Sequence, residues 1–76
     1  MDFKTATDHL TACISHAEIA DAAGVSVQSI RQARLDQNNP NHRPPPDAWQ
    51  KAVIRLAKEK RRELKALIEQ LRQGPA

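Results

Sequence analysis

The 76-residue chain contains few of the features that mark secreted, membrane-spanning or disulfide-bonded proteins. Its single cysteine, Cys13, cannot form an internal disulfide, so nothing points to an oxidising compartment. No apolar run approaches the ~20 residues of a membrane span. The first residues, MDFKTATDHL, lack the basic and apolar segments of a secretory signal. We therefore expect a cytoplasmic protein.

Aromatic residues and glycine are also scarce. Phe3 and Trp49 are the aromatic residues, and Gly24 is the one glycine before the tail. Prolines are concentrated at 40–46, so Ala, Leu, Ile and Val must do most of the packing. This composition favours an all-α fold. The length allows one small domain of four or five helices and leaves little room for an active-site cleft.

Catalytic and metal-binding patterns are missing as well. The sequence has no nucleophile–base–acid set, no glycine-rich phosphate loop and no His-Glu-x-x-His motif, so we expect neither an enzyme nor a cofactor. His9, Cys13 and His16 have the spacing of metal ligands on one helix. The helix is expected to break near Ser15, and a fourth ligand is not evident. We therefore expect no metal, and a buried structural thiol at Cys13.

Charge is distributed unevenly along the chain. Residues 1–23 carry one lysine against four acidic residues, whereas residues 24–76 carry eleven Lys and Arg against five acidic residues. A basic second part can face a polyanion, or it can be a solvated helix surface. Charge alone leaves both interpretations open.

Apolar spacing predicts a first helix over residues 3–14. Asp2 can cap its start. Side chains recur at steps of three and four and form one stripe, made of Phe3, Ala6, Leu10, Cys13 and Ile14.

Capping signals predict two more helices. Ser15 and Glu18 have the pattern of a capping box, and the helix that they begin should end at Gly24, which tolerates the left-handed conformation. Ser26 can then cap a third helix over residues 27–35. Its inward face would be Val27, Ile30 and Ala33.

A polar, proline-rich loop and a long helix follow. Residues 36–46 form the loop, whose three final prolines stiffen it into an extended arm. Asp47 can cap a helix that no Gly or Pro interrupts up to Gln73. That helix carries a first apolar stripe of Trp49, Ala52, Val53, Leu56 and Ala57, in which Trp49 is expected to be a core residue. A second stripe consists of Leu64, Leu67, Ile68 and Leu71.

The second stripe needs a cover. A helix over residues 47–73 spans roughly 40 Å at ~1.5 Å per residue, so its end would project past a body this small. The economical cover is the same helix of a second copy in a two-fold dimer. The alternative is that the stripe folds back on the first helix.

The segment HAEIADAAGVSVQSIRQARL, residues 16–35, has spacing that suits two crossing helices. Ala20 is small where the helices would touch, and Gly24 permits the turn. Val25 fills the space under the turn, and Ile30 anchors the second helix. The outer side of that helix is then free to enter a major groove.

This segment resembles the helix-turn-helix of lambda repressor/Cro-like (XRE-type) transcriptional regulators. The stretch RPPPDAWQKAVIRLA is similar to short regulators of phages and conjugative elements. The resemblance implies a lambda-repressor-like domain over residues 1–57. A dimerisation helix over 58–73 and a tail over 74–76 would follow.

The resemblance also implies which residues touch DNA. Gln can pair with adenine and Arg with guanine, and Val can contact a thymine methyl group. The expected base-reading residues are Val27, Gln28, Ser29, Arg31 and Gln32. The expected phosphate contacts are His16, Ser26, Arg34, His42, Arg43 and Lys51. His16 stands where the family often has Gln.

The function expected from these features is that of a bacterial regulator, nucleoid-associated when bound to DNA. A homodimer would bind an inverted-repeat operator on double-stranded DNA. Repression is expected, with its own promoter a candidate target, and RNA polymerase or another regulator is a further candidate partner. The alternative is a helical protein-interaction module that uses the second stripe, like an antiactivator, without binding DNA.

Overall fold

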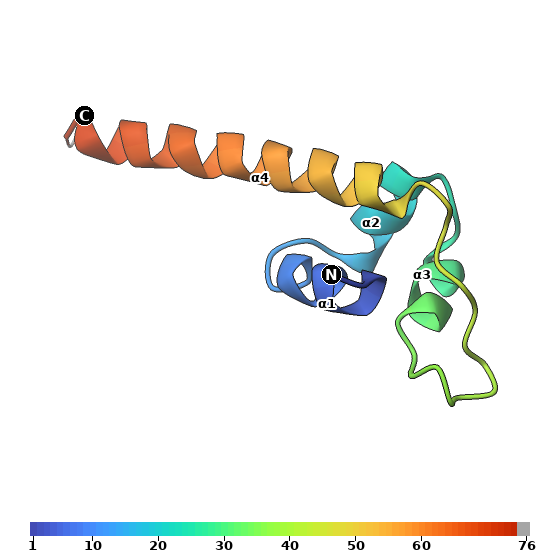
Figure 1. Ribbon diagram of the computed structural model, residues 1–76. Coiled ribbons are helices and arrows are strands. Elements are labelled where there is room, and N and C mark those ends of the chain that lie inside the picture. The colour runs from blue at the N-terminus through green and yellow to red at the C-terminus, as the bar shows by residue number, and fades with distance from the viewer. Residues whose placement is uncertain (75–76) are drawn as a thin grey trace.

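The chain folds into four helices, and a computed structural model describes residues 1–74. The helices are α1 (Phe3–Leu10), α2 (His16–Ala23), α3 (Val27–Ala33) and α4 (Trp49–Arg72). No strand occurs in that range, so the fold is all-α, as predicted. The first three helices form a small body with the start of α4, and the rest of α4 projects from it (Figure 1). Residues 75 and 76 of the predicted tail lie outside the described residues.

Helix α1 begins as predicted but ends earlier. The Asp2 carboxylate accepts the N–H of Thr5 at 2.8 Å and caps the first turn. The helix ends at Leu10, and the chain continues as a turn in which the N–H of Ile14 still reaches the Leu10 carbonyl. That turn buries Ile14 and rotates Cys13 outward. The prediction of a buried thiol is therefore wrong, because Cys13 is exposed.

The predicted caps of α2 and α3 are present. Ser15 and Glu18 form the full capping box at α2, and the Ser26 hydroxyl accepts the N–H of Ser29 at α3. Gly24 takes the left-handed conformation, with φ +71°, and its N–H bonds back to the end of α2. Helix α3 is two residues shorter than predicted, because it ends at Ala33.

Helix α4 starts two residues later than predicted, and Asp47 does not cap it. The N-cap is Ala48, which makes no side-chain hydrogen bond. The Trp49 N–H instead bonds the Pro46 carbonyl, so the proline arm leads the chain into the helix. The Trp49 ring meets Phe3 edge to face, with centroids 5.4 Å apart, in the core position expected for it.

The core lies where α1, α2, α3 and the first turns of α4 meet. Ile30 is fully buried, Ile19 is 1% exposed, and small Ala20 is also buried between the helices. The remaining buried members of the cluster are Phe3, Leu10, Ile14, Ala33 and Leu56. The first stripe of α4 thus packs as predicted, except that Ala57 is exposed. Burial of this kind is the main force that holds such short helices together.

The second half of α4 has no cover. Leu64, Leu67 and Ile68 are each about half exposed, and Leu71 is 72% exposed. The alternative in which this stripe folds back on the first helix is therefore wrong for this structure. The molecule measures 54 × 20 × 20 Å because of this projection. Within residues 1–74, no helix is long and apolar enough to cross a membrane.

Candidate functional site

The outer face of α3 collects the side chains that the sequence assigns to base reading. Gln28 and Arg31 are exposed, and Ser29 and Gln32 are partly exposed. Val27 is also partly exposed, but it packs against the core as well. Buried Ile30 and Ala33 hold the opposite side of α3 in the body. Helix α3 is thus anchored by its buried side and exposes the long polar side chains of Gln28 and Arg31.

A groove of about 460 Å³ separates the starts of α2 and α3. Its lining comes from both helices and from the end of the α1–α2 turn: Thr11, Ile14, Ser15, His16, Ala17, Val27 and Arg31. The Ser15 hydroxyl already accepts the Glu18 N–H at 3.2 Å. The N–H groups of His16 and Ala17 precede the first intrahelical bonds, so they remain available to a ligand. With the Arg31 guanidinium beside them, they offer donors to an anion.

Arg34, expected to contact phosphate, does not face outward in the structure. As the C-cap of α3 its side chain is only 19% exposed, and it crosses to the other helices. One guanidinium nitrogen meets His16 Nε2 on α2, and the other forms an ion pair with Asp8 on α1. Its Nε is buried and has no hydrogen-bond partner among residues 1–74. Arg34 therefore ties the end of α3 to α1 and α2.

This network shifts the titration of both of its partners. Hydrogen bonds from Arg34 and then Lys4 lower the pKa of Asp8. Burial lowers the pKa of His16, and the charges of Arg34 and Arg31 lower it further. The guanidinium can only donate, so His16 Nε2 must be the unprotonated nitrogen. His16 is therefore held neutral, and it stands at the edge of the groove.

The loop arm is attached to α3. The Arg43 N–H bonds the Gln32 carbonyl at 3.3 Å, so exposed Arg43 lies beside the end of α3. Two Asx turns, at Asp36 and Asn39, shape the loop before it. Of the other predicted phosphate contacts, exposed Ser26 caps α3, and exposed Lys51 lies on α4, which packs on α1 and α2.

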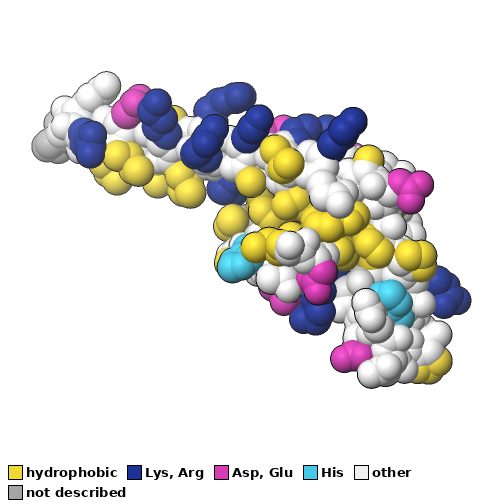
Figure 2. Space-filling model, viewed as in Figure 1, with side chains coloured by type: hydrophobic (Ala, Val, Ile, Leu, Met, Phe, Trp, Pro, Cys, Tyr) yellow, Lys and Arg dark blue, Asp and Glu magenta, His cyan; other side chains and the backbone are white. Residues whose placement is uncertain are grey.

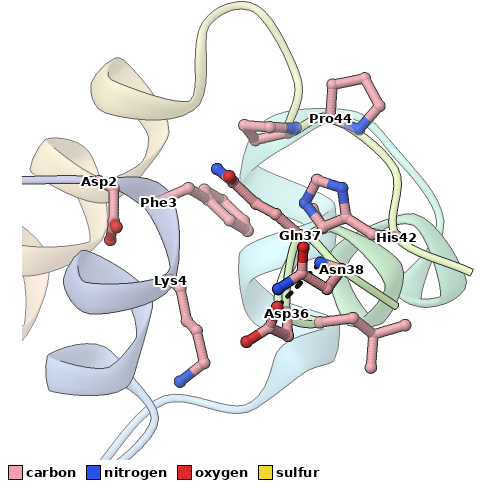
Figure 3. A pocket seen from close by; sticks show the side chains of 11 residues that line it. Asp2, Phe3, Lys4, Asp36, Gln37, Asn38, His42 and Pro44 are labelled. Carbon is pink, nitrogen blue, oxygen red and sulfur yellow. Dashed lines mark hydrogen bonds between the residues drawn. The ribbon is translucent and has the colours of Figure 1, made fainter. Parts of the chain in front are cut away.

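A second cavity, of about 620 Å³, lies between the start of α1 and the loop. Figure 3 shows Phe3 and Lys4 on its α1 side, with Gln37, His42 and Pro44 on its loop side. Acidic Asp2 and Asp36 also line it, so its charges do not favour an anion. Half-buried His42 faces this cavity rather than the groove.

Comparisons of the chain with protein-family models, with curated proteins and with solved structures found no match. The arrangement of its own residues therefore has to carry any statement about function. Within the described residues, no group of three or more His, Cys, Asp or Glu side chains could hold a metal ion.

Sequence reasoning missed the Asp8–Arg34–His16 network. The three residues are 8 to 26 positions apart, on three helices, and no local pattern links them. The one available signal was the position of Arg34 at the predicted end of α3. A long cation at a helix end can reach a neighbouring element as readily as solvent.

Proposed function

We propose that this protein is a sequence-specific DNA-binding transcriptional regulator of the lambda-repressor-like helix-turn-helix kind. Helix α3 enters the major groove, α2 rests its N-terminus on the sugar–phosphate backbone, and a homodimer reads an inverted repeat. One observation carries the proposal. A Ser26-capped helix that presents Gln28 and Arg31 follows α2 across a left-handed Gly24 turn.

The groove supports the assignment of backbone contacts. A phosphate there would meet the N–H groups of His16 and Ala17 at the positive end of α2. Arg31 lines the same groove, so it can lie between a phosphate and the base edges. Neutral His16 adds no charge to the groove. We assign it a positioning role, in which its hydrogen bond with Arg34 holds the end of α3. Arg43 and Lys51 are the candidate outer contacts, and Arg34 is left out because it is engaged inside the body.

Base contacts are assigned to the exposed side of α3. Gln28 is suited to a bidentate contact with adenine and Arg31 to one with guanine. Gln32 and Ser29 lie beside them, and Val27 exposes part of its side chain toward the groove. Repression by occupying a promoter needs only this binding surface, so repression is the proposed mode.

The test begins with selection of bound sequences from random DNA, followed by shift assays on the selected operator. Gln28→Ala and Arg31→Ala should each weaken binding by about 1–3 kcal/mol, roughly 5- to 150-fold. The matched control is Arg72→Ala, which removes the same charge at the far end of α4 and should bind as wild type.

If both α3 variants bind the operator as tightly as wild type, the reading face is wrongly assigned. If the wild-type protein enriches no sequence, the proposed function itself is wrong.

A second candidate function, a protein-interaction module without DNA binding, is favoured by one observation. The stripe Leu64, Leu67, Ile68 and Leu71 is exposed and suits contact with another regulator. The two candidates differ in their response to salt. A DNA binder should lose affinity steeply between low and moderate salt, since it displaces counterions from phosphates, whereas the module would show no such DNA affinity.

A further inference from the structure

The projecting half of α4 has two unlike faces. Its underside carries Leu64, Leu67, Ile68 and Leu71, and Lys and Arg side chains crowd its upper side (Figure 2). The apolar positions recur at steps of three and four and form a narrow stripe. This stripe continues the line of Val53 and Leu56, which pack in the body. A stripe of this width is the seam of a helix–helix pair.

The stripe fits a second copy better than a membrane surface. Helices that lie on lipid bury a broad apolar face, often with aromatic residues, and this stripe is aliphatic and narrow. Glu63 also flanks it, where it would approach lipid phosphates. A second α4 offers a stripe of the same width and chemistry, so the surface is complementary to itself.

Lys60 decides how two such helices can be oriented. It lies within the stripe, one heptad before Leu67, with its side chain 29% exposed and paired with Glu63 at 3.0 Å. In a parallel pair, Lys60 would face the partner's Lys60 across the seam. In an antiparallel pair with Leu64 opposite the partner's Leu67, the two lysines are about 16 Å apart along the axis, at ~1.5 Å per residue. Like charges then never meet.

The body supplies the remaining contact area. A stable interface takes roughly 20–30 residues a side, more than one stripe provides. The α1–α2 turn lies beneath the middle of α4 (Figure 1), and Ala12 and Cys13 of this turn are exposed. In an antiparallel pair, the end of each α4 passes beside this turn of the other copy.

We propose that α4 pairs antiparallel with α4 of a second copy, with Lys60 excluding the parallel arrangement and each helix end lying beside the other copy's α1–α2 turn. This inference rests on the homodimer of the proposed function but not on DNA binding. It sets the spacing of the two bodies, since Ala52 and the partner's Ala52 come to lie about 40 Å apart.

The test measures distances between spin labels in the protein without DNA. In a Cys13→Ser background, one variant carries Lys51→Cys and another Glu69→Cys. Both positions are exposed and lie on the same side of α4, five turns apart. Antiparallel pairing predicts label separations along the axis of about 40 Å at 51 and about 10 Å at 69. Sedimentation of each labelled protein checks the oligomeric state.

Equal label separations at the two positions would mean a parallel pair and overturn the proposed orientation. A monomer in sedimentation would overturn pairing altogether. If that monomer also co-sediments with anionic phosphatidylserine vesicles, lipid is the occupant of the stripe. A monomer would also remove the homodimer from the proposed function. None of these outcomes changes the shift assays on α3, so the pairing of α4 and the base-reading face of α3 fail separately.

Discussion

At the scale of single residues, Arg34 couples the candidate reading helix to the rest of the body. Its guanidinium joins Asp8 and His16, so the end of α3 is held by α1 and α2 together. A reading helix must keep its side chains in fixed positions to discriminate base pairs. Under the proposed function, the network would hold α3 in this way through the side chains of Asp8, His16 and Arg34.

His16 makes this network sensitive to pH. Because its folded-state pKa is lowered, the unfolded chain takes up the proton first as the pH falls. The free energy of unfolding should therefore be largest above the ordinary pKa of about 6.5 and decrease below it. The positive charges of Arg31 and Arg34 disfavour protonation of His16. The nearby carboxylate of Asp8 is already paired with Arg34. The lowered pKa of Asp8 affects the free energy of unfolding only at more acidic pH, where carboxylates titrate.

We expect His16→Gln to flatten the pH dependence of stability between about pH 7.5 and 5.5, measured by urea unfolding at several pH values. His9→Gln, on the exposed side of α1, is the matched control and should keep the wild-type slope. A His16→Gln protein with an unchanged slope would contradict the assigned role of the network.

At the scale of elements, α4 serves two purposes in one helix. Trp49, Val53 and Leu56 complete the core, and the last turns of α4 carry the exposed apolar stripe from Leu64 to Leu71. Ion pairs of Arg55 with Glu59 and of Lys60 with Glu63 support the helix along its surface. An exposed aliphatic stripe of this length is unfavourable in water unless it is covered.

The stripe leads to a prediction for Leu67→Lys, which places a charge at the centre of the proposed seam. Losing a buried Leu from both copies removes roughly 3–6 kcal/mol of association free energy, about 100-fold or more in Kd. Sedimentation should then find a monomer with unchanged helix content by circular dichroism. Ala66→Lys, a lysine added one residue earlier on the opposite side of α4, should remain dimeric. Equal association of the two variants would rule out the seam.

At the scale of the whole molecule, the proposed function assigns DNA binding to the body and dimerisation to the projecting part of α4. A body about 20 Å wide presents α3, and a projecting helix can hold a second body at a set distance. One short helix has few contacts with DNA, so two linked copies gain affinity from binding together. In the proposed DNA-binding dimer, the basic upper side of α4 (Figure 2) would create a favourable long-range field toward DNA.

A rigid dimer fixes the spacing of its operator. Half-sites should lie ~10–10.5 base pairs apart, centre to centre, or a multiple of this. Inserting about 5 base pairs turns one half-site to the opposite face of the duplex and should reduce affinity to that of a single half-site. Shift assays on the selected operator measure this. Equal affinity for a single half-site and for the full repeat would contradict dimeric binding.

The sequence by itself determined the local structure. The structure has three predicted helix starts, at Asp2, Ser15 and Ser26, and the predicted left-handed turn at Gly24. All four features depend on hydrogen bonds between residues that are close in the chain. The buried stripe of α3 follows in the same way from helical spacing. Two local predictions were wrong: Asp47 does not cap α4, because the proline arm leads the chain into that helix, and Cys13 is exposed, because it lies in a turn after α1.

Only the tertiary structure decided which side chains meet across elements. From the sequence, Arg34 is indistinguishable from the other cations expected to face outward. In the structure, α1 and α2 place Asp8 and His16 within hydrogen-bond distance of its guanidinium. The exposure of the stripe from Leu64 to Leu71 likewise depends on where the body ends beneath α4. Both depend on contacts between residues far apart in the chain. Local propensity and periodicity carry no information about such contacts, because they describe only neighbours within a few turns.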